Sequence, residues 1–145
     1  IPAGSTATLT VQASGSEPLS YRWFHDGIPI EADTAECLLS NVQPADAGGY
    51  RVQVSNLGGA VQSEVALVEV AVPPLRVESI VRTPSTVSIV FSAWRGLSYT
   101  LEFKDDLNAP EWIPLFPAQP GTGSDLTLTD TVPPLGPRFY RVRSE

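Results

Sequence analysis

The chain of 145 residues has few of the side chains on which most enzymatic and metal-dependent chemistry relies. It contains one cysteine, one histidine and no methionine. A single cysteine cannot close an intrachain disulfide, and one histidine with one cysteine is too small a set for the usual zinc sites. We therefore expect no intrachain disulfide, no metal centre and no cofactor.

Positive charge is scarce as well. Nine Lys and Arg residues stand against sixteen Asp and Glu residues, which gives a formal net charge of -7. Because phosphate binding requires clustered basic side chains, this balance argues against nucleic acid as a partner. No apolar run approaches the roughly 20 residues of a membrane span, and no basic-then-apolar leader is present. The chain begins at Ile1, and we expect it to be a piece of a longer protein, with the upstream domains of that protein as neighbours.

Short apolar runs are abundant, and 14 prolines and 11 glycines separate them. The runs alternate apolar and polar residues, which is the period of half-buried antiparallel strands, and no helical period is present. Strands are predicted at residues 6–13, 21–25, 28–30, 37–40, 49–55 and 60–70, and again at 75–81, 86–91, 99–103, 112–115, 126–128 and 138–142. Paired prolines at 73 and 74 mark the boundary between these two groups of strands. The prediction is an all-β chain of two tandem antiparallel β-sandwiches.

A turn in the first half carries Asp46, two glycines and Tyr50 and leads directly into an alternating strand. This arrangement resembles the tyrosine corner of immunoglobulin-like domains, whose hydroxyl bonds back to upstream backbone. With Trp23 as the core tryptophan, residues 1–70 resemble the I-set-like immunoglobulin repeats of large secreted bacterial proteins. The resemblance implies an immunoglobulin-like sandwich over residues 1–71, in which Val11 and Val52 occupy the positions of the family's disulfide cysteines.

In the second half of the chain, the aromatic and charged residues have a different spacing from those of the first half. Tyr99 to Phe103, then Trp112, Asp130 and finally Arg138 to Val142 resemble the fibronectin-type-III-like C-terminal modules of secreted bacterial proteins. This resemblance implies a second sandwich over residues 75–145, joined to the first by a proline linker at 72–74. No complete strand is expected after residues 138–142. Both resemblances imply an extracellular or cell-surface location.

Residues that might carry catalysis are isolated from one another. His25 lies beside a hairpin turn without a nucleophile motif, so we interpret it as a partly exposed strand-end histidine. Cys37 alternates with apolar residues and is interpreted as a small buried hydrophobe. Asp105 and Asp106, with Asn108 and Glu111 nearby, predict an acidic turn that caps backbone N–H groups, with calcium as the alternative. We therefore expect that the chain is not an enzyme.

Exposed aromatic and arginine side chains are the remaining means of recognition. The immunoglobulin resemblance implies that the strands at 21–25 and 49–55 are neighbours. We therefore expect their outward residues to form one patch, namely Arg22, Phe24, Arg51 and Gln53. Trp94, in a loop of the second half, is the alternative contact. Two functions stay open: a noncatalytic spacer or interaction pair of a larger secreted or surface bacterial protein, and a carbohydrate-binding accessory module of a polysaccharide-active enzyme. The partner would be a protein or a polysaccharide accordingly.

Overall fold

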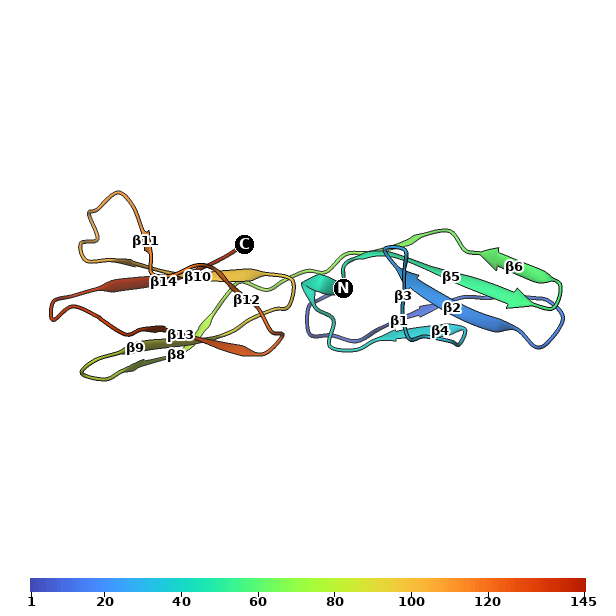
Figure 1. Ribbon diagram of the computed structural model, residues 1–145, viewed down its shortest axis with the longest axis horizontal. Coiled ribbons are helices and arrows are strands. Elements are labelled where there is room, and N and C mark those ends of the chain that lie inside the picture. The colour runs from blue at the N-terminus through green and yellow to red at the C-terminus, as the bar shows by residue number, and fades with distance from the viewer. The chain divides into compact units, whose positions relative to one another are not determined.

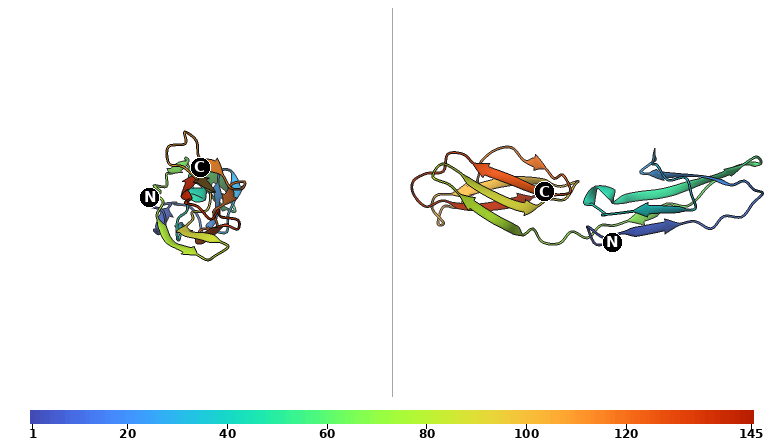
Figure 2. Two further views of the ribbon diagram at one scale, coloured as in Figure 1. Left: turned by 90° about the vertical axis from the view of Figure 1, so that its left-hand side faces the viewer. Right: turned by 90° about the horizontal axis from the view of Figure 1, so that it is seen from below.

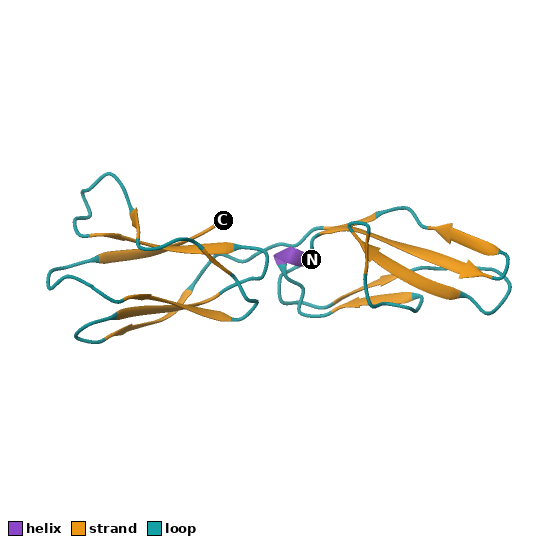
Figure 3. Ribbon diagram, viewed as in Figure 1, coloured by secondary structure: helices purple, strands orange, loops and turns teal.

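A computed structural model of the chain describes all of residues 1–145. Figures 1 and 3 show that nearly every regular element is a β-strand, and η1 (Pro44–Asp46) is a single turn of 3₁₀ helix. The predicted all-β class is therefore confirmed. The chain divides into two compact units, Ile1–Pro73 and Pro74–Glu145, which are described separately below. No helix has the length and apolarity needed to cross a lipid bilayer.

The first unit contains seven strands in two antiparallel sheets. The strands are β1 (Ala7–Thr10), β2 (Ser20–His25), β3 (Ile28–Pro29), β4 (Glu36–Leu39), β5 (Gly48–Asn56), β6 (Gly59–Gln62) and β7 (Ala66–Val68). One sheet has only β1 and β4, and the other has the order β3-β2-β5-β6, with β7 also paired to β5. Figure 2 gives two further views of these strands.

The core of the first unit lies between its two sheets. Trp23, Cys37 and Val52 form one cluster of buried residues, and Leu9 and Val11 pack against it. The indole Nε1–H of Trp23 donates to the carbonyl of Thr34 at 2.9 Å, which satisfies its polar group. The predicted burial of Trp23 and Cys37 is confirmed, and burial raises the pKa of the Cys37 thiol. Val11 and Val52 belong to the same apolar cluster.

Two predicted strands of the first unit differ from the observed ones. The strand expected at 6–13 ends at Thr10, and Ala13, which was expected to face inward, is exposed. The strand expected at 60–70 is divided into β6 and β7 by an irregular segment at Ser63. The Ser63 hydroxyl lies at this break, where it accepts a hydrogen bond from the Val52 N–H and donates one to the Glu64 carbonyl. The side chain thus replaces part of the regular ladder.

The second unit is a sandwich of a three-stranded and a four-stranded sheet. Its strands are β8 (Val77–Arg82), β9 (Val87–Ser92), β10 (Ser98–Lys104), β11 (Ile113–Pro114), β12 (Gln119–Pro120), β13 (Asp125–Asp130) and β14 (Phe139–Ser144). One sheet has the order β13-β9-β8, and in the other β10 pairs with β11, β12 and β14. The short strand β12 was not predicted, because it contains a proline and pairs over only two residues.

The core of the second unit is larger. Its buried residues are Val87, Ile89, Phe91, Ala93, Tyr99, Leu101 and Leu128. They come from β9, β10 and β13 and the residue after β9, so both sheets contribute to one layer. No strand follows β14. The likeness of this unit to fibronectin type III modules stays a prediction.

Candidate functional site

The four polar and aromatic residues predicted to share a surface lie together on the larger sheet of the first unit. In the antiparallel pairing of β2 with β5, Arg22 is opposite Gln53 and Phe24 is opposite Arg51. The guanidinium carbons of Arg22 and Arg51 lie 5.7 and 5.8 Å from the centroid of the Phe24 ring. These distances are within the range of cation–π contacts. We call these four residues the Phe24 patch.

The alternation of strand residues explains why the Phe24 patch faces solvent. Trp23 and Val52 are opposite each other in the same pair of strands, and both are buried in the core. Their sequence neighbours Phe24 and Arg51 therefore point to the other side of the sheet. Arg22 is exposed, and Phe24, Arg51 and Gln53 are half-buried. The site combines a half-buried aromatic ring with two cations, and neither guanidinium is in an ion pair.

Trp94 is not part of this surface. It belongs to the second unit, in the loop between β9 and β10, and is half-buried. Its backbone N–H donates to the Tyr99 hydroxyl at 2.8 Å. Its carbonyl oxygen lies so close to Gly121 that a Cβ there would be 2.1 Å away. The backbone of Trp94 is thus fixed from two sides, while ligand contact by its ring stays a prediction.

The tyrosine corner is present in the first unit. The Tyr50 hydroxyl donates to the carbonyl of Asp46 at 2.9 Å, and the Asp46 carboxylate accepts the Gln43 N–H at 2.8 Å. Burial, followed by the nearby Asp46 charge, raises the pKa of Tyr50 to about 12. The sequence-based interpretation of Tyr50 is confirmed.

His25 packs into this corner. Its ring stacks on Tyr50 with 4.4 Å between centroids, and its Nε2 lies 3.1 Å from the carbonyl of Ala47. Gly48 has a φ of +147°, and a Cβ on it would approach His25 Nε2 to 2.5 Å. Only glycine suits that position. His25 is half-buried at the end of β2, as predicted, and its described contacts include no hydroxyl or thiol nucleophile.

The acidic turn of the second unit uses its carboxylates for local contacts. Asp106 accepts hydrogen bonds from the backbone and side-chain nitrogens of Asn108 at 2.9 and 3.1 Å. The predicted capping role is confirmed for Asp106. Asp105 instead receives two hydrogen bonds from Arg138, at 2.7 and 3.1 Å.

A buried polar network extends from Arg138 and was not predicted. Asp130, with a side chain 3% exposed, accepts from Arg138 at 3.0 Å, from the Tyr140 hydroxyl at 2.8 Å and from the Val132 N–H at 2.9 Å. Burial tends to raise the pKa of Asp130, but these three donors outweigh it, so that the pKa is lowered. The same burial, with Asp130 beside it, raises the pKa of Tyr140 to about 12. No pattern of residues predicts this pairing, because it depends on which strands become neighbours.

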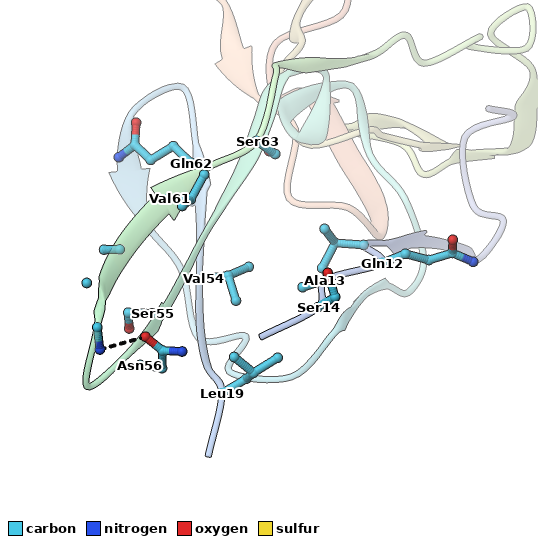
Figure 4. Close-up of a pocket in the computed structure, with 14 residues that line it drawn as sticks. Gln12, Ala13, Ser14, Leu19, Val54, Ser55, Asn56, Val61, Gln62 and Ser63 are labelled. Carbon is cyan, nitrogen blue, oxygen red and sulfur yellow. Dashed lines mark hydrogen bonds between the residues drawn. The ribbon is translucent and has the colours of Figure 1, made fainter. Parts of the chain in front are cut away.

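The first unit also has a pocket of about 610 Å³, shown in Figure 4. It lies between the segment 11–14 and the β5–β6 hairpin, and Leu19 and Val54 contribute apolar walls. Its lining includes serine, glutamine and asparagine side chains but no charged or aromatic group. A pocket without a charge or a ring has little means of orienting a polar ligand, so the Phe24 patch is the better candidate site.

Comparison with known proteins supports the fold assignment of the first unit. Residues 1–56, which end with β5, match the family model described as immunoglobulin domain. The titin segment A168169 has a similar fold, with a TM-score of 0.50 and 19% identity over 90% of this chain and 77% of that one. The first unit is thus immunoglobulin-like.

Two curated proteins are similar in sequence over part of the chain. The muscle M-line assembly protein unc-89 of Caenorhabditis elegans is 30% identical over 84 residues, which are 50% of this chain. The cell adhesion molecule DSCAM of Gallus gallus is 35% identical over 66 residues, or 41% of this chain. The chain covers only 1% and 3% of the lengths of these relatives. Neither description names a catalytic activity.

Proposed function

We propose that the chain is a noncatalytic interaction module whose first unit binds a protein partner through the Phe24 patch. The observation that carries the proposal is the pairing of two guanidinium groups without carboxylate partners around one aromatic ring. Arginine and aromatic side chains contribute most of the binding energy in many protein interfaces. The matching partner surface carries carboxylates, because these form bidentate hydrogen bonds with guanidinium groups.

A protein partner fits this patch better than a sugar. Sugar rings stack on an open aromatic face, and the Phe24 ring has two guanidinium groups within 6 Å of its centroid. The other aromatic candidate, Trp94, is half-buried in a loop of the second unit. The carbohydrate-binding alternative therefore lacks an open aromatic platform.

The same proposal assigns the parent protein to the secreted or surface proteins of bacteria. The bacterial source rests on the resemblance of both halves to modules of such proteins alone, whereas the immunoglobulin domain match supports an interaction module without indicating a source. The similarity to a protein described as a cell adhesion molecule is in keeping with it.

The test uses the chain as bait for the extracellular and surface proteins of a bacterial source. A captured partner is measured with the wild type and with the double variant Phe24→Ala, Arg51→Ala. We expect the double variant to weaken binding by about 1 kcal/mol or more, roughly fivefold, and to leave the melting curve unchanged.

A matched control is Ile28→Ala, which removes an exposed apolar side chain from neighbouring β3 and should retain full affinity. Full binding by the patch variant would refute the assignment. Retention of the wild type on a polysaccharide affinity gel, lost in the patch variant, would show that the partner is a carbohydrate.

A further inference from the structure

The outer face of the larger sheet in the first unit continues from the Phe24 patch onto β7. In the pairing of β5 with β7, Leu67 is opposite Gly49. The neighbouring Tyr50 is buried, so alternation places Gly49 and Leu67 on the other face of the sheet, which is the face of Arg51. Val65 precedes β7 by one residue, and the same register brings it beside Arg51. Two aliphatic side chains therefore adjoin the Phe24 patch.

These two side chains are largely exposed to solvent. Val65 is 61% exposed and Leu67 is 72% exposed. Val65 also lies against β5, because a Cβ on Gly49 would be only 2.9 Å from Val65 Cγ1. A residue without a side chain at position 49 thus lets Val65 extend the apolar surface across β5. Adjoining apolar side chains mark interaction sites, whereas single exposed ones are ordinary. We call Val65 and Leu67 the aliphatic strip.

The charge on this face changes sign along β5. At one end, the guanidinium groups of Arg22 and Arg51 lie beside Phe24 and are in no ion pair. At the other end, the carboxylate of Asp26 accepts the Gly49 N–H at 2.7 Å. The side chain of Asp26 is 62% exposed. Arg51 and Gly49 are two residues apart on one strand, so the change from positive to negative charge occurs over about 7 Å.

This charge gradient fixes the direction in which an acidic segment can bind. A carboxylate of the partner is attracted to the arginine end of the face and repelled by Asp26 at the other end. An apolar side chain next to that carboxylate then lies on the aliphatic strip. Alternate residues of an extended chain are also about 7 Å apart and point to the same side. An acidic residue and an aliphatic residue separated by one position therefore match Arg51 and Leu67.

A second copy of the chain matches this face less well than a separate acidic segment. In a twofold pairing, the copy would offer the carboxylate of Asp26 to both Arg22 and Arg51. That carboxylate already accepts the Gly49 N–H and lies 3.5 Å from His25 Nε2. The net charge of -7 on each copy also opposes self-association.

We infer that the partner recognised by the Phe24 patch presents an extended acidic and aliphatic segment. Its carboxylate binds Arg22 and Arg51, and its aliphatic side chain packs on the aliphatic strip. The inference rests on the proposed function, because it states the chemistry of the partner at the same site. The guanidinium groups supply orientation, and burial of apolar area on Val65 and Leu67 supplies affinity.

The probe is an end-blocked peptide of nine residues, with glutamate at its fourth position, leucine at its sixth and serine elsewhere. Binding to the full chain is followed by NMR through the amide signals of both units. We expect saturable shifts in β2, β5 and β7 and none in the second unit. A peptide with glutamine in place of glutamate, and one with serine in place of leucine, should each bind at least threefold more weakly.

One pair of leucine variants makes the test specific. Leu67→Ser should weaken binding of the glutamate and leucine peptide at least threefold and leave binding of the leucine-free peptide unchanged. Leu38→Ser is the matched control, because Leu38 is 65% exposed but lies on β4 in the other sheet. It should bind both peptides like the wild type. Val65→Ser is a second variant of the strip and should act like Leu67→Ser. The melting curves of all three variants should match that of the wild type.

The outcomes separate this inference from the proposed function. If Phe24→Ala with Arg51→Ala weakens peptide binding but Leu67→Ser and Val65→Ser bind like Leu38→Ser, the aliphatic strip is not part of the site. That result would overturn the inference and leave the proposed function intact. Peptide binding that the Phe24 and Arg51 double variant does not weaken would contradict both. A dimer in sedimentation velocity that Leu67→Ser dissociates would show that the occupant is a second copy and would overturn the inference.

Discussion

The same three residues, Tyr-Arg-Val, occur in both units and have different partners in each. In β5 they are Tyr50, Arg51 and Val52, and in β14 they are residues 140–142. The tyrosine and valine point toward the core in both strands. Tyr50 donates to a neutral carbonyl, whereas Tyr140 donates to a carboxylate. The shared motif sets the orientation of the side chains, and the neighbouring strands decide what each side chain does.

The partners of the arginine in this Tyr-Arg-Val motif differ more between the two units than those of the tyrosine. Arg51 lies opposite Phe24 and has no carboxylate partner, while Arg141 lies opposite the buried Glu102 and bonds to it. The first unit thus leaves its arginines available for recognition. The second unit uses its arginines, including Arg138, to compensate its own buried carboxylates. In the proposed function, recognition by the first unit and stability of the second unit therefore draw on the same residue type.

The largest effect is expected from Arg138→Met. This variant leaves the Asp130 carboxylate buried without its guanidinium partner, so the second unit should lose about 3–5 kcal/mol of unfolding free energy. Unfolding in urea, followed by NMR signals from each unit, measures the loss. The control Asp105→Asn removes the exposed partner of the same guanidinium and should cost much less. Equal losses of unfolding free energy in the two variants would show that the buried Asp130 contact contributes no more to stability than the exposed Asp105 contact.

Removal of each tyrosine hydroxyl compares the two tyrosine hydrogen bonds directly. Tyr140→Phe should destabilise the second unit by about 2 kcal/mol, because it deletes a hydrogen bond to a charged group. Tyr50→Phe should destabilise the first unit by about 1 kcal/mol, because its acceptor is neutral. The urea midpoints of both units give the values. An unchanged midpoint in Tyr50→Phe would mean that the corner contributes through packing alone.

Lowering the pH should reduce the stability of the second unit more than that of the first. The pKa of Asp130 is lowered in the folded state, so its contribution is fully present above the ordinary carboxyl pKa of about 4 and is lost as the pH falls through the lowered value. The hydrogen bond of Tyr50 joins a phenol to a backbone carbonyl, and neither of these two groups titrates in this range. Urea midpoints measured between pH 7 and pH 3 should therefore fall more steeply for the second unit. A steeper fall in the first unit would contradict this expectation.

The smallest effect is expected from calcium and its removal. Asp105 is bonded to Arg138, and Asp106 is bonded to Asn108, so both carboxylates already have partners. Neither EDTA nor added calcium should shift the melting temperature of either unit. A shift of several degrees in the melting temperature would instead support calcium binding by the acidic turn.

Much of the fold and part of the site could be predicted because strands have a period of two. Alternation placed Trp23 and Val52 inside and Phe24 and Arg51 outside, and the pairing of β2 with β5 joined them into one patch. The predicted burial of Cys37 followed from the same pattern, and the role of Tyr50 followed from the turn before its strand. These are local properties, since each depends on a strand and its nearest neighbour.

The features that were missed depend on contacts between distant segments. The bond between Asp130 and Arg138 forms because β13 and the chain before β14 meet at one end of the second sandwich. The division after β6 lies at Ser63, whose hydroxyl accepts a hydrogen bond from the distant Val52 N–H. Residue spacing alone carries no information about any of these.

The most direct measurement replaces the same arginine of the shared motif in each unit. Arg51→Gln and Arg141→Gln are compared for affinity toward the captured partner and for the stability of both units. We expect Arg51→Gln to weaken binding about fivefold with unchanged stability, and Arg141→Gln to destabilise the second unit with unchanged binding. Unchanged binding in Arg51→Gln, or weakened binding in Arg141→Gln alone, would contradict the assignment of recognition to the first unit.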